Sequence, residues 1–162
     1  MAEEANVLSC LLVPLVGRRL IVPRACVAEV IGLGRLRLRE EGPPWLLGEV
    51  GWSERVVPLV CFEVACGDPV PAIGGRSRAV VLRSLTGRLG RGGMAMLCQG
   101  LPQLVRIGAE VLQSDTSEPG PPGAPILTRV RIVNESPVIP DLEAIEHRIA
   151  DLLEAAGAVA PA

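Results

Sequence analysis

Short apolar runs, each ended by glycine, proline or charged residues, recur along the whole chain. The densest is Val56 to Val64, in which six of nine residues are apolar and most of these six are β-branched. This pattern predicts a strand buried on both faces or nearly so. Pro58 cannot donate a backbone hydrogen bond, so we expect it at an edge, a bulge or a strand crossing. A polar crest, Gly51 to Glu54, precedes this strand, and the whole stretch from Gly48 to Val64 is suited to contact with another protein.

The remaining apolar runs are short and are separated by turn-forming residues, as expected for strands joined by hairpins and loops. Two prolines and three glycines mark residues 67–75 as a connector between two lobes. In chain order we expect a hairpin of residues 7–16 and 20–22, a helical turn within 24–30, a loop at 33–41, a strand at 79–82, a turn at 86–93, a strand at 94–98, a shorter strand within 101–107, a surface loop at 114–125, and a hairpin of 126–133 and 137–139.

The periodicity becomes helical after Pro140, and Asp141 is suited to cap a helix that extends to about Ala156. Apolar residues at helical spacing predict that this helix packs on the strands; they are Leu142, Ile145, Ile149, Leu152 and Leu153. The carboxylates of the segment are interpreted as its solvated face, and they are Asp141, Glu143, Glu146, Asp151 and Glu154. About ten short strands and one helix predict an all-β fold with closed or nearly closed sheets.

The composition indicates a folded domain, because 49% of the 162 residues are hydrophobic. A chain of this length forms one domain, or two small lobes that share a core, and buries roughly 70% of its unfolded surface. Trp45, Trp52 and Phe62 are the only aromatic residues, whereas binding of single-stranded nucleic acid uses several aromatic side chains. Since the net charge is only −2, binding to a phosphate backbone is also disfavoured, and we expect no nucleic-acid partner.

Residues that could carry catalysis are few. All sixteen cationic residues are arginine, which excludes a Schiff-base lysine and a Walker lysine. The single histidine, His147, lies on the polar side of the predicted helix without an evident nucleophile or orienting partner. The glycine-rich segment 86–93 lacks the lysine of a phosphate-binding loop and is followed by a strand, so we interpret it as a hairpin turn that needs positive φ. We expect no enzyme activity and no cofactor.

Five cysteines are spaced too irregularly for a zinc site or a disulfide framework; they are at positions 10, 26, 61, 66 and 98. Most lie in or beside apolar runs, and we interpret them as reduced thiols in a cytoplasmic protein. The acidic opening Met1 to Glu4 is unlike a secretory signal, and runs such as Leu11 to Val16 are too short to cross a bilayer. We expect no metal and no direct membrane insertion.

Five arginines between residues 76 and 91 have no acidic residue among them; they are Arg76, Arg78, Arg83, Arg88 and Arg91. Two interpretations stay open. The charges either protect a solvated strand edge from aggregation, or they attract an acidic protein partner.

Several segments match, in order and spacing, the motifs of one known family. Cys10 to Pro23 looks like its opening hairpin, and Val27 to Val30 is similar to its VxEV turn. The run that ends in GxxNLRGxxxPV is resembled by Pro44 to Gly48 together with Val56 to Val60. The family's vGllVDxVxxV pair is resembled by Gly93 to Cys98 together with Leu104 and Val105. Its aspartate-led last segment is resembled by Asp141 to Glu143. Over roughly Val7 to Leu153 the chain thus resembles the CheW-like family of chemotaxis coupling proteins, which link receptors to a histidine kinase.

The resemblance implies two five-stranded, SH3-like β-barrels packed side by side, with a C-terminal α-helix. We expect one CheW-like domain over residues 1–162, with lobe 1 at about 7–66, lobe 2 at about 76–140 and the helix at about 141–156. The resemblance further implies a non-enzymatic adaptor that couples the cytoplasmic tip of a chemoreceptor to the regulatory domain of a CheA-like histidine kinase. Residues that match the family's contact positions are Val27, Glu29, Gly48, Ser53 and Gly93.

One departure bears on partner binding. Where the family has NLRG, this chain has Gly51-Trp52-Ser53-Glu54, so the arginine that could bind a carboxylate with two hydrogen bonds is absent. Strand alternation predicts that Arg55 lies on the same side as Ser53 and replaces it. Trp52, if exposed, is the natural hot spot; if buried, it is a core residue. We therefore add Trp52, Glu54 and Arg55 to the partner-binding residues and expect a divergent coupling protein of a pilus or surface-motility system.

A second hypothesis is a small-molecule-binding β-barrel module with its ligand in the cleft between the lobes. Such a site requires a well-formed apolar pocket into which a few polar groups converge.

Overall fold

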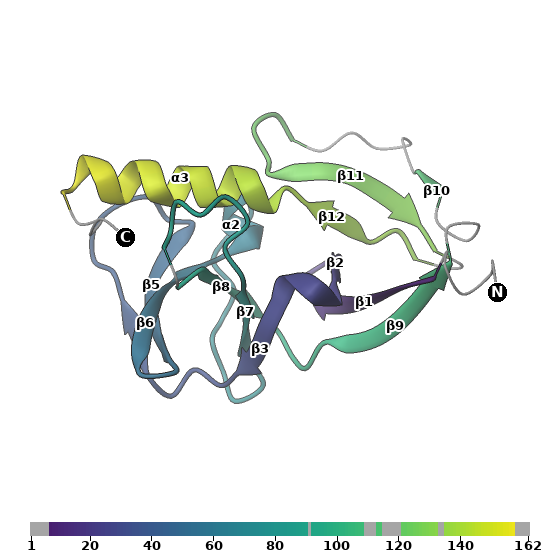
Figure 1. Ribbon diagram of the computed structural model, residues 1–162, viewed down its shortest axis with the longest axis horizontal. Helices are drawn as coiled ribbons and strands as arrows, with labels where there is room; N and C mark the ends of the chain where they lie inside the picture. The colour runs from purple at the N-terminus through teal and green to yellow at the C-terminus, as the bar shows by residue number, and fades with distance from the viewer. Residues whose placement is uncertain (1–6, 91, 109–112, 115–120, 133–134, 158–162) are drawn as a thin grey trace.

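Two six-stranded sheets and a C-terminal helix make up the computed structural model (Figure 1). The structure describes residues 7–90, 92–108, 113–114, 121–132 and 135–157. The strands of the first sheet lie in the order β10-β11-β12-β2-β1-β9, and those of the second in the order β3-β7-β8-β6-β5-β4. The elements in chain order are β1 (Val7–Pro14), β2 (Arg19–Pro23), η1 (Arg24–Cys26), β3 (Val27–Ile31), β4 (Leu36–Leu38), β5 (Leu46–Trp52), β6 (Arg55–Val60), α2 (Phe62–Ala65), β7 (Arg78–Leu82), β8 (Met94–Cys98), β9 (Gln103–Gly108), β10 (Gln113–Ser114), β11 (Ile126–Arg131), β12 (Val138–Pro140) and α3 (Leu142–Ala155).

The mostly-β, two-lobed fold with a C-terminal helix is as predicted, but the lobes are divided differently along the chain. The first sheet takes β1 and β2 from the start of the chain and β9 to β12 from its later part, whereas the second takes the six strands between them. Parallel pairing of β12 with β2 and of β6 with β8 brings the distant segments together. Each sheet has six strands instead of five. Among the described residues no pairing joins the two ends of either sheet, so the sheets are not closed barrels.

Three apolar cores explain why the apolar runs in the sequence predict strands that are buried on both faces. The strands alternate between a core shared by the two sheets and a core of their own sheet. On β7, for example, Val80 and Leu82 belong to the shared core, whereas Ala79 and Val81 belong to the core of the second sheet. Cys10, Leu12 and Ile21 contribute in the same way to the core of the first sheet. The helix α3 follows β12 directly and runs over the lobe of the second sheet, where it covers the shared core (Figure 1).

The strand predicted at Val56 to Val64 ends at Val60, and the polar crest before it is the turn of a hairpin. β5 and β6 form an antiparallel hairpin, and Phe62 and Val64 lie in the short helix α2. β6 is also paired with β8, but only at Leu59 and Val60. Pro58 therefore lies just before the point where β6 gains its second neighbour, a position that needs no hydrogen bond from its nitrogen on that side.

Other local predictions are confirmed or corrected in detail. The N-terminal hairpin and the β7–β8 pair form as predicted. Residues 24–30 give a 3-10 turn followed by β3, and the expected loop at 33–41 contains the short strand β4. In segment 86–93, positive φ at Gly87, Gly90 and Gly93 confirms the glycine-dependent turn. The acidic N-terminus, Arg91, residues 115–120 of the proline-rich loop, Val133, Asn134 and the tail after Gly157 lie outside the described residues.

All five cysteines are free thiols, and four of them are buried. Burial raises the pKa of the Cys61 thiol from 9.0 to about 12 and that of Cys98 to about 11. The folded protein therefore keeps protons that the unfolded chain releases above pH 9. The stabilisation that these two protonated thiols contribute is fully present below pH 9 and is lost as the pH rises toward 11–12.

We accordingly expect the free energy of unfolding, measured by urea denaturation, to fall between pH 9 and pH 11. A Cys61→Ala, Cys98→Ala variant is the control and should lose most of that dependence. An equal slope in both proteins would show that other groups cause it.

Candidate partner-binding surface

The tip of the β5–β6 hairpin is a two-residue turn made by Ser53 and Glu54. Trp52 pairs with Arg55, and the two residues between them have φ of 49° and 63°. Positive φ at both central residues is typical of a type I′ turn, whose twist matches the strands. A side chain in this region costs about 1–2 kcal/mol per residue, and the family's glycine at position 54 would avoid that cost. Both residues are exposed, so the crest predicted from the sequence is a projecting polar tip.

Trp52 lies half-buried at the base of this tip. Its ring packs against the core of the second sheet, and its Nε1 donates a hydrogen bond of 3.4 Å to Glu29 Oε1 on β3. The Arg55 guanidinium lies over the ring, 5.9 Å from its centroid. Residues 23 positions apart thus meet, because the sheet curls until its β3 edge approaches the hairpin. We call Glu29, Trp52 and Arg55 the Trp52 cluster.

Arg55 does not replace Ser53 by strand alternation, as the sequence suggested. The chain reverses between them, so Arg55 pairs with Trp52 and stacks on its ring. Alternation holds only within one extended strand, and Ser53 is in the turn. The guanidinium nevertheless stays exposed at the tip.

Val27 and Gly93 both lie beside Leu82, the last residue of β7. Val27 pairs with Leu82 and packs against the shared core. Gly93 has φ of 69°, and a Cβ built on it would lie 2.1 Å from the Leu82 carbonyl oxygen. The structure thus gives Gly93 a backbone role in the β7–β8 connection.

Gly48 is buried beneath β4. A Cβ built on it would lie 2.0 Å from the carbonyl oxygen of Arg37 and 2.9 Å from Leu38 Cα. The missing side chain allows β4 to lie against β5, so the role of Gly48 visible in the structure is to hold this edge in place.

A hollow of about 520 Å³ lies beside the hairpin tip. Sequence reasoning did not identify it, because it forms only where β4 lies against the hairpin. Its lining is mostly charged and consists of Arg35, Arg37, Glu49, Gly51, Glu54, Arg55 and Val56.

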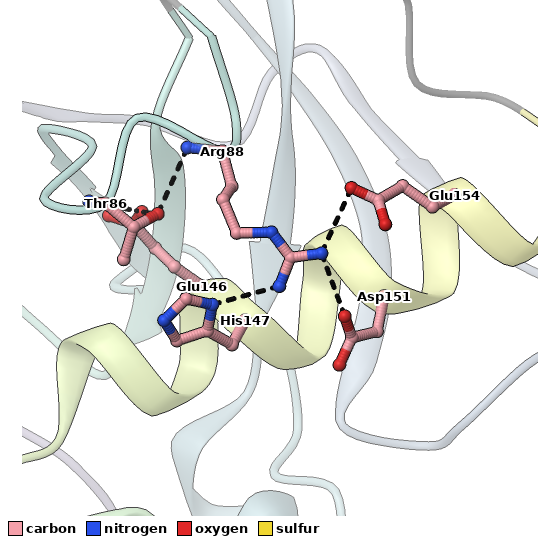
Figure 2. Close-up of polar contacts among 6 residues, drawn as sticks. All are labelled: Thr86, Arg88, Glu146, His147, Asp151 and Glu154. Carbon is pink, nitrogen blue, oxygen red and sulfur yellow. Dashed lines mark hydrogen bonds and ion pairs between the residues drawn. The ribbon is translucent and has the colours of Figure 1, made fainter.

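Glu146 was expected on the solvated face of the last helix, but it is completely buried. Its carboxylate accepts hydrogen bonds from the Thr86 hydroxyl at 2.6 Å and the Thr86 N–H at 3.1 Å (Figure 2). The Ser84 hydroxyl donates to the same carboxylate at 3.0 Å. The carboxylate also accepts from the N–H of Leu85. Four donors around one carboxylate satisfy its charge, so α3 fixes the start of the β7–β8 connection.

Arg88 adds an exposed contact between the same loop and α3. Figure 2 shows its guanidinium reaching three side chains of the helix: Asp151 at 2.9 Å, Glu154 at 3.0 Å and Nδ1 of His147 at 2.9 Å. The hydrogen bond to Asp151, followed by that to Glu154, raises the Arg88 pKa further above its usual value. His147 is exposed, as predicted, and accepts a hydrogen bond from Arg88 in this arrangement.

The arginine run therefore has no single role. Arg88 binds acidic residues of its own chain, and Arg78 and Arg83 donate to backbone carbonyls of Gly75 and Ala25. An acidic partner is thus not needed to explain Arg88, and Arg91 lies outside the described residues.

A signal for Glu146 was present in the sequence. Leu142, Ile145 and Ile149 define an apolar stripe at positions i, i+3 and i+7, and Glu146 occupies the i+4 position of that stripe. A carboxylate at such a position needs several donors, and the loop carries two short hydroxyl residues, Ser84 and Thr86. Glu63, also buried, gave no such signal; it accepts from the Val16 N–H at 3.0 Å.

In the part of the chain that the structure describes, no group of three or more His, Cys, Asp or Glu residues is arranged to hold a metal ion. No helix there has the length and apolar character needed to cross a membrane.

The chain folds into two β-sheets and a C-terminal helix, and a polar hairpin tip is exposed on the second sheet. The family model of the CheW-like domain matches residues 9–149, and the chain belongs to this family. Among solved structures, the scaffolding protein TtCheW from Thermoanaerobacter tengcongensis is similar, with a TM-score of 0.68 and 12% sequence identity over 82% of this chain and 88% of that one. At that identity the likeness concerns the fold. A search of curated protein sequences finds no match.

Proposed function

We propose that the protein is a non-enzymatic adaptor of a bacterial chemosensory system, and that it couples the cytoplasmic tip of a chemoreceptor to the regulatory domain of a CheA-like histidine kinase. The observation that carries the proposal is the Trp52 cluster, in which a partly exposed aromatic ring contacts Glu29 and Arg55 at the base of an exposed tip. Aromatic and arginine side chains in such positions are typical hot spots of protein interfaces. The family and the named scaffold of similar fold support it.

Packing favours the adaptor over a small-molecule module. Side chains from both sheets and from α3 pack into one apolar core between the lobes, where the ligand was expected. The five free thiols suit a reducing cytoplasm, where both proposed partners are found.

The departure from NLRG supports output to pilus-driven or surface motility instead of flagellar swimming. Glu54 places a negative charge where the family has glycine, which favours a different partner. A strain lacking the protein should lose surface motility and keep swimming; the reverse phenotype would oppose this part of the proposal.

We expect a Trp52→Ala, Arg55→Ala variant to lose the kinase in co-purification from the native cell. Removal of a hot spot of this kind costs about 2–4 kcal/mol of binding, or roughly thirtyfold or more in affinity. The circular dichroism spectrum should stay unchanged, because Arg55 is exposed and Trp52 is only partly buried.

An Arg76→Ala variant serves as the control and should retain the kinase, because Arg76 is an exposed arginine outside the hairpin of β5 and β6. Undiminished retention by the double variant would remove the Trp52 cluster from the interface. Failure of the wild-type protein to retain any histidine kinase would oppose the adaptor function itself.

A further inference from the structure

The strand β4 is an edge of the second sheet and pairs, among the described residues, with β5 alone. The residues that flank β4 bond inward to β5: the Arg35 carbonyl accepts from the Gly51 N–H at 3.3 Å, and the Arg39 N–H donates to the Leu47 carbonyl at 2.7 Å. Alternation in an antiparallel pair therefore turns the N–H and C=O of Leu38 outward. The edge offers backbone groups to an incoming strand.

One face of this edge is cationic. Arg35 and Arg37 are exposed, project to the same side two residues apart, and line the 520 Å³ hollow with Arg55. A Cβ on Gly51 would lie 2.8 Å from Arg35 Cδ, so the absence of a side chain there lets the Arg35 stem lie flat on the sheet. Glu49 faces Arg37 across the strands. Within the described chain, however, no carboxylate oxygen comes within 4.0 Å of these three guanidinium groups.

The other side of the edge combines exposed aliphatic side chains with the charged residues Arg39, Glu40 and Glu41. Leu38, between Arg37 and Arg39, is 58% exposed and lines a second hollow of about 330 Å³. Val70 and Ile73 line the same hollow and are 52% and 39% exposed. Three large aliphatic side chains therefore stand open to solvent beside unpaired backbone groups.

Arginines on a short edge strand can also serve only to prevent unwanted pairing. Charge alone achieves that protection. Protection by charge does not account for the exposed aliphatic side chains around the hollow of Leu38. It also does not explain why a glycine, Gly51, lies beneath the Arg35 side chain.

We propose that β4 is a docking edge for an extended segment of a partner protein in which carboxylate and aliphatic side chains alternate. The segment adds a strand to the sheet through Leu38. Its carboxylates bind Arg35 and Arg37, and its aliphatic side chains enter the hollow of Leu38, Val70 and Ile73. Glu54 and Arg55 also line the 520 Å³ hollow, so this edge adjoins the Trp52 cluster. The inference rests on the proposed adaptor function and specifies the chemistry of its partner.

The first test uses a labelled ten-residue peptide of alternating glutamate and valine, flanked by glycine and serine, and measures fluorescence anisotropy. The wild-type protein should bind it and should not bind an alternating lysine–valine peptide. The same glutamates and valines arranged in two blocks should bind at least about tenfold more weakly, because only alternation separates the two kinds of side chain on a strand.

An Arg35→Glu, Arg37→Glu variant should lose binding by at least about tenfold, since two attractive charge pairs become repulsive. Arg76→Glu with Arg106→Glu is matched in charge, changes two exposed arginines outside the edge, and should bind as the wild type does. Equal loss in both variants, or binding of the block peptide as tight as that of the alternating one, would overturn the proposal.

A Leu38→Pro variant removes the outward N–H, which an edge strand tolerates when that N–H faces solvent. It should abolish peptide binding. Should this variant fail to fold, hydrogen exchange of the Leu38 amide in the wild-type protein decides: protection by the peptide supports strand addition, and unchanged exchange overturns it.

Co-purification separates this inference from the proposed function. If the wild type and the Arg35→Glu, Arg37→Glu variant both retain the kinase and receptor equally, the docking edge is refuted and the adaptor stands. If the wild type retains neither partner while the peptide binds at Leu38, the edge stands and the adaptor function falls.

Discussion

Replacing Glu146 with alanine is expected to lower the free energy of unfolding by about 3–5 kcal/mol. The substitution removes one buried carboxylate and leaves two backbone N–H groups and two hydroxyls without their acceptor. Each buried donor left unpaired costs about 1–3 kcal/mol, in part offset by rearrangement of the exposed side of the loop. Urea denaturation monitored by circular dichroism measures the change.

Two companion variants locate the effect. Thr86→Val removes one hydroxyl, which donates to Glu146 and accepts from the Arg88 N–H, and should cost about 1–2 kcal/mol. Glu143→Ala changes an exposed carboxylate of the same helix and should stay within about 0.5 kcal/mol of the wild type. If Glu146→Ala were as mild as Glu143→Ala, the carboxylate would not be holding the β7–β8 connection.

Replacing Gly48 with alanine is the second large effect, with an expected loss of about 2–4 kcal/mol. The new methyl group would lie 2.0 Å from the Arg37 carbonyl oxygen, and a backbone atom cannot move aside as a flexible side chain can. β4 must therefore separate from β5. We expect faster hydrogen exchange of the Arg39 amide in the variant, because this amide donates to the Leu47 carbonyl in the wild-type protein.

Gly34→Ala is the matched control, because no atom lies within 4 Å of its built Cβ and its φ is not positive. It should be neutral, or should stabilise by about 0.4–1 kcal/mol by restricting the unfolded chain. Gly48→Ala with unchanged stability and an unchanged Arg39 amide would contradict the tight contact between β4 and β5.

Local patterns predicted most elements well. The hairpin at the start of the chain, the β7–β8 pair and the glycine turns followed from apolar runs and turn residues, whose effects act over a few positions. Asp141 was predicted to cap the helix, and its Oδ1 accepts from the Ala144 N–H at 3.0 Å. The predicted strand at Val56 to Val64 extended beyond the end of β6, because Phe62 and Val64 continue the apolar run although they form the short helix α2.

The candidate site was predicted in part. The exposed tip at Ser53 and Glu54 follows from polarity, but the contact between Trp52 and Glu29 depends on the curl of a whole sheet. Gly48 and Gly93 were singled out as contact positions, whereas the structure shows both fitted against carbonyl oxygens. A sequence shows that a glycine is present but does not show which atom lies opposite it.

The sequence by itself determined that short aliphatic strands and one capped helix form a mostly-β protein, since burial patterns and caps are encoded over neighbouring residues. Only the tertiary structure decided which strands share a sheet, because β12 beside β2 and β6 beside β8 join segments far apart in the chain. The same long-range packing buried Glu146 under the loop at Ser84 to Thr86 and left the edge at β4 open. Such outcomes depend on which surfaces meet, and that information resides in no single stretch of the chain.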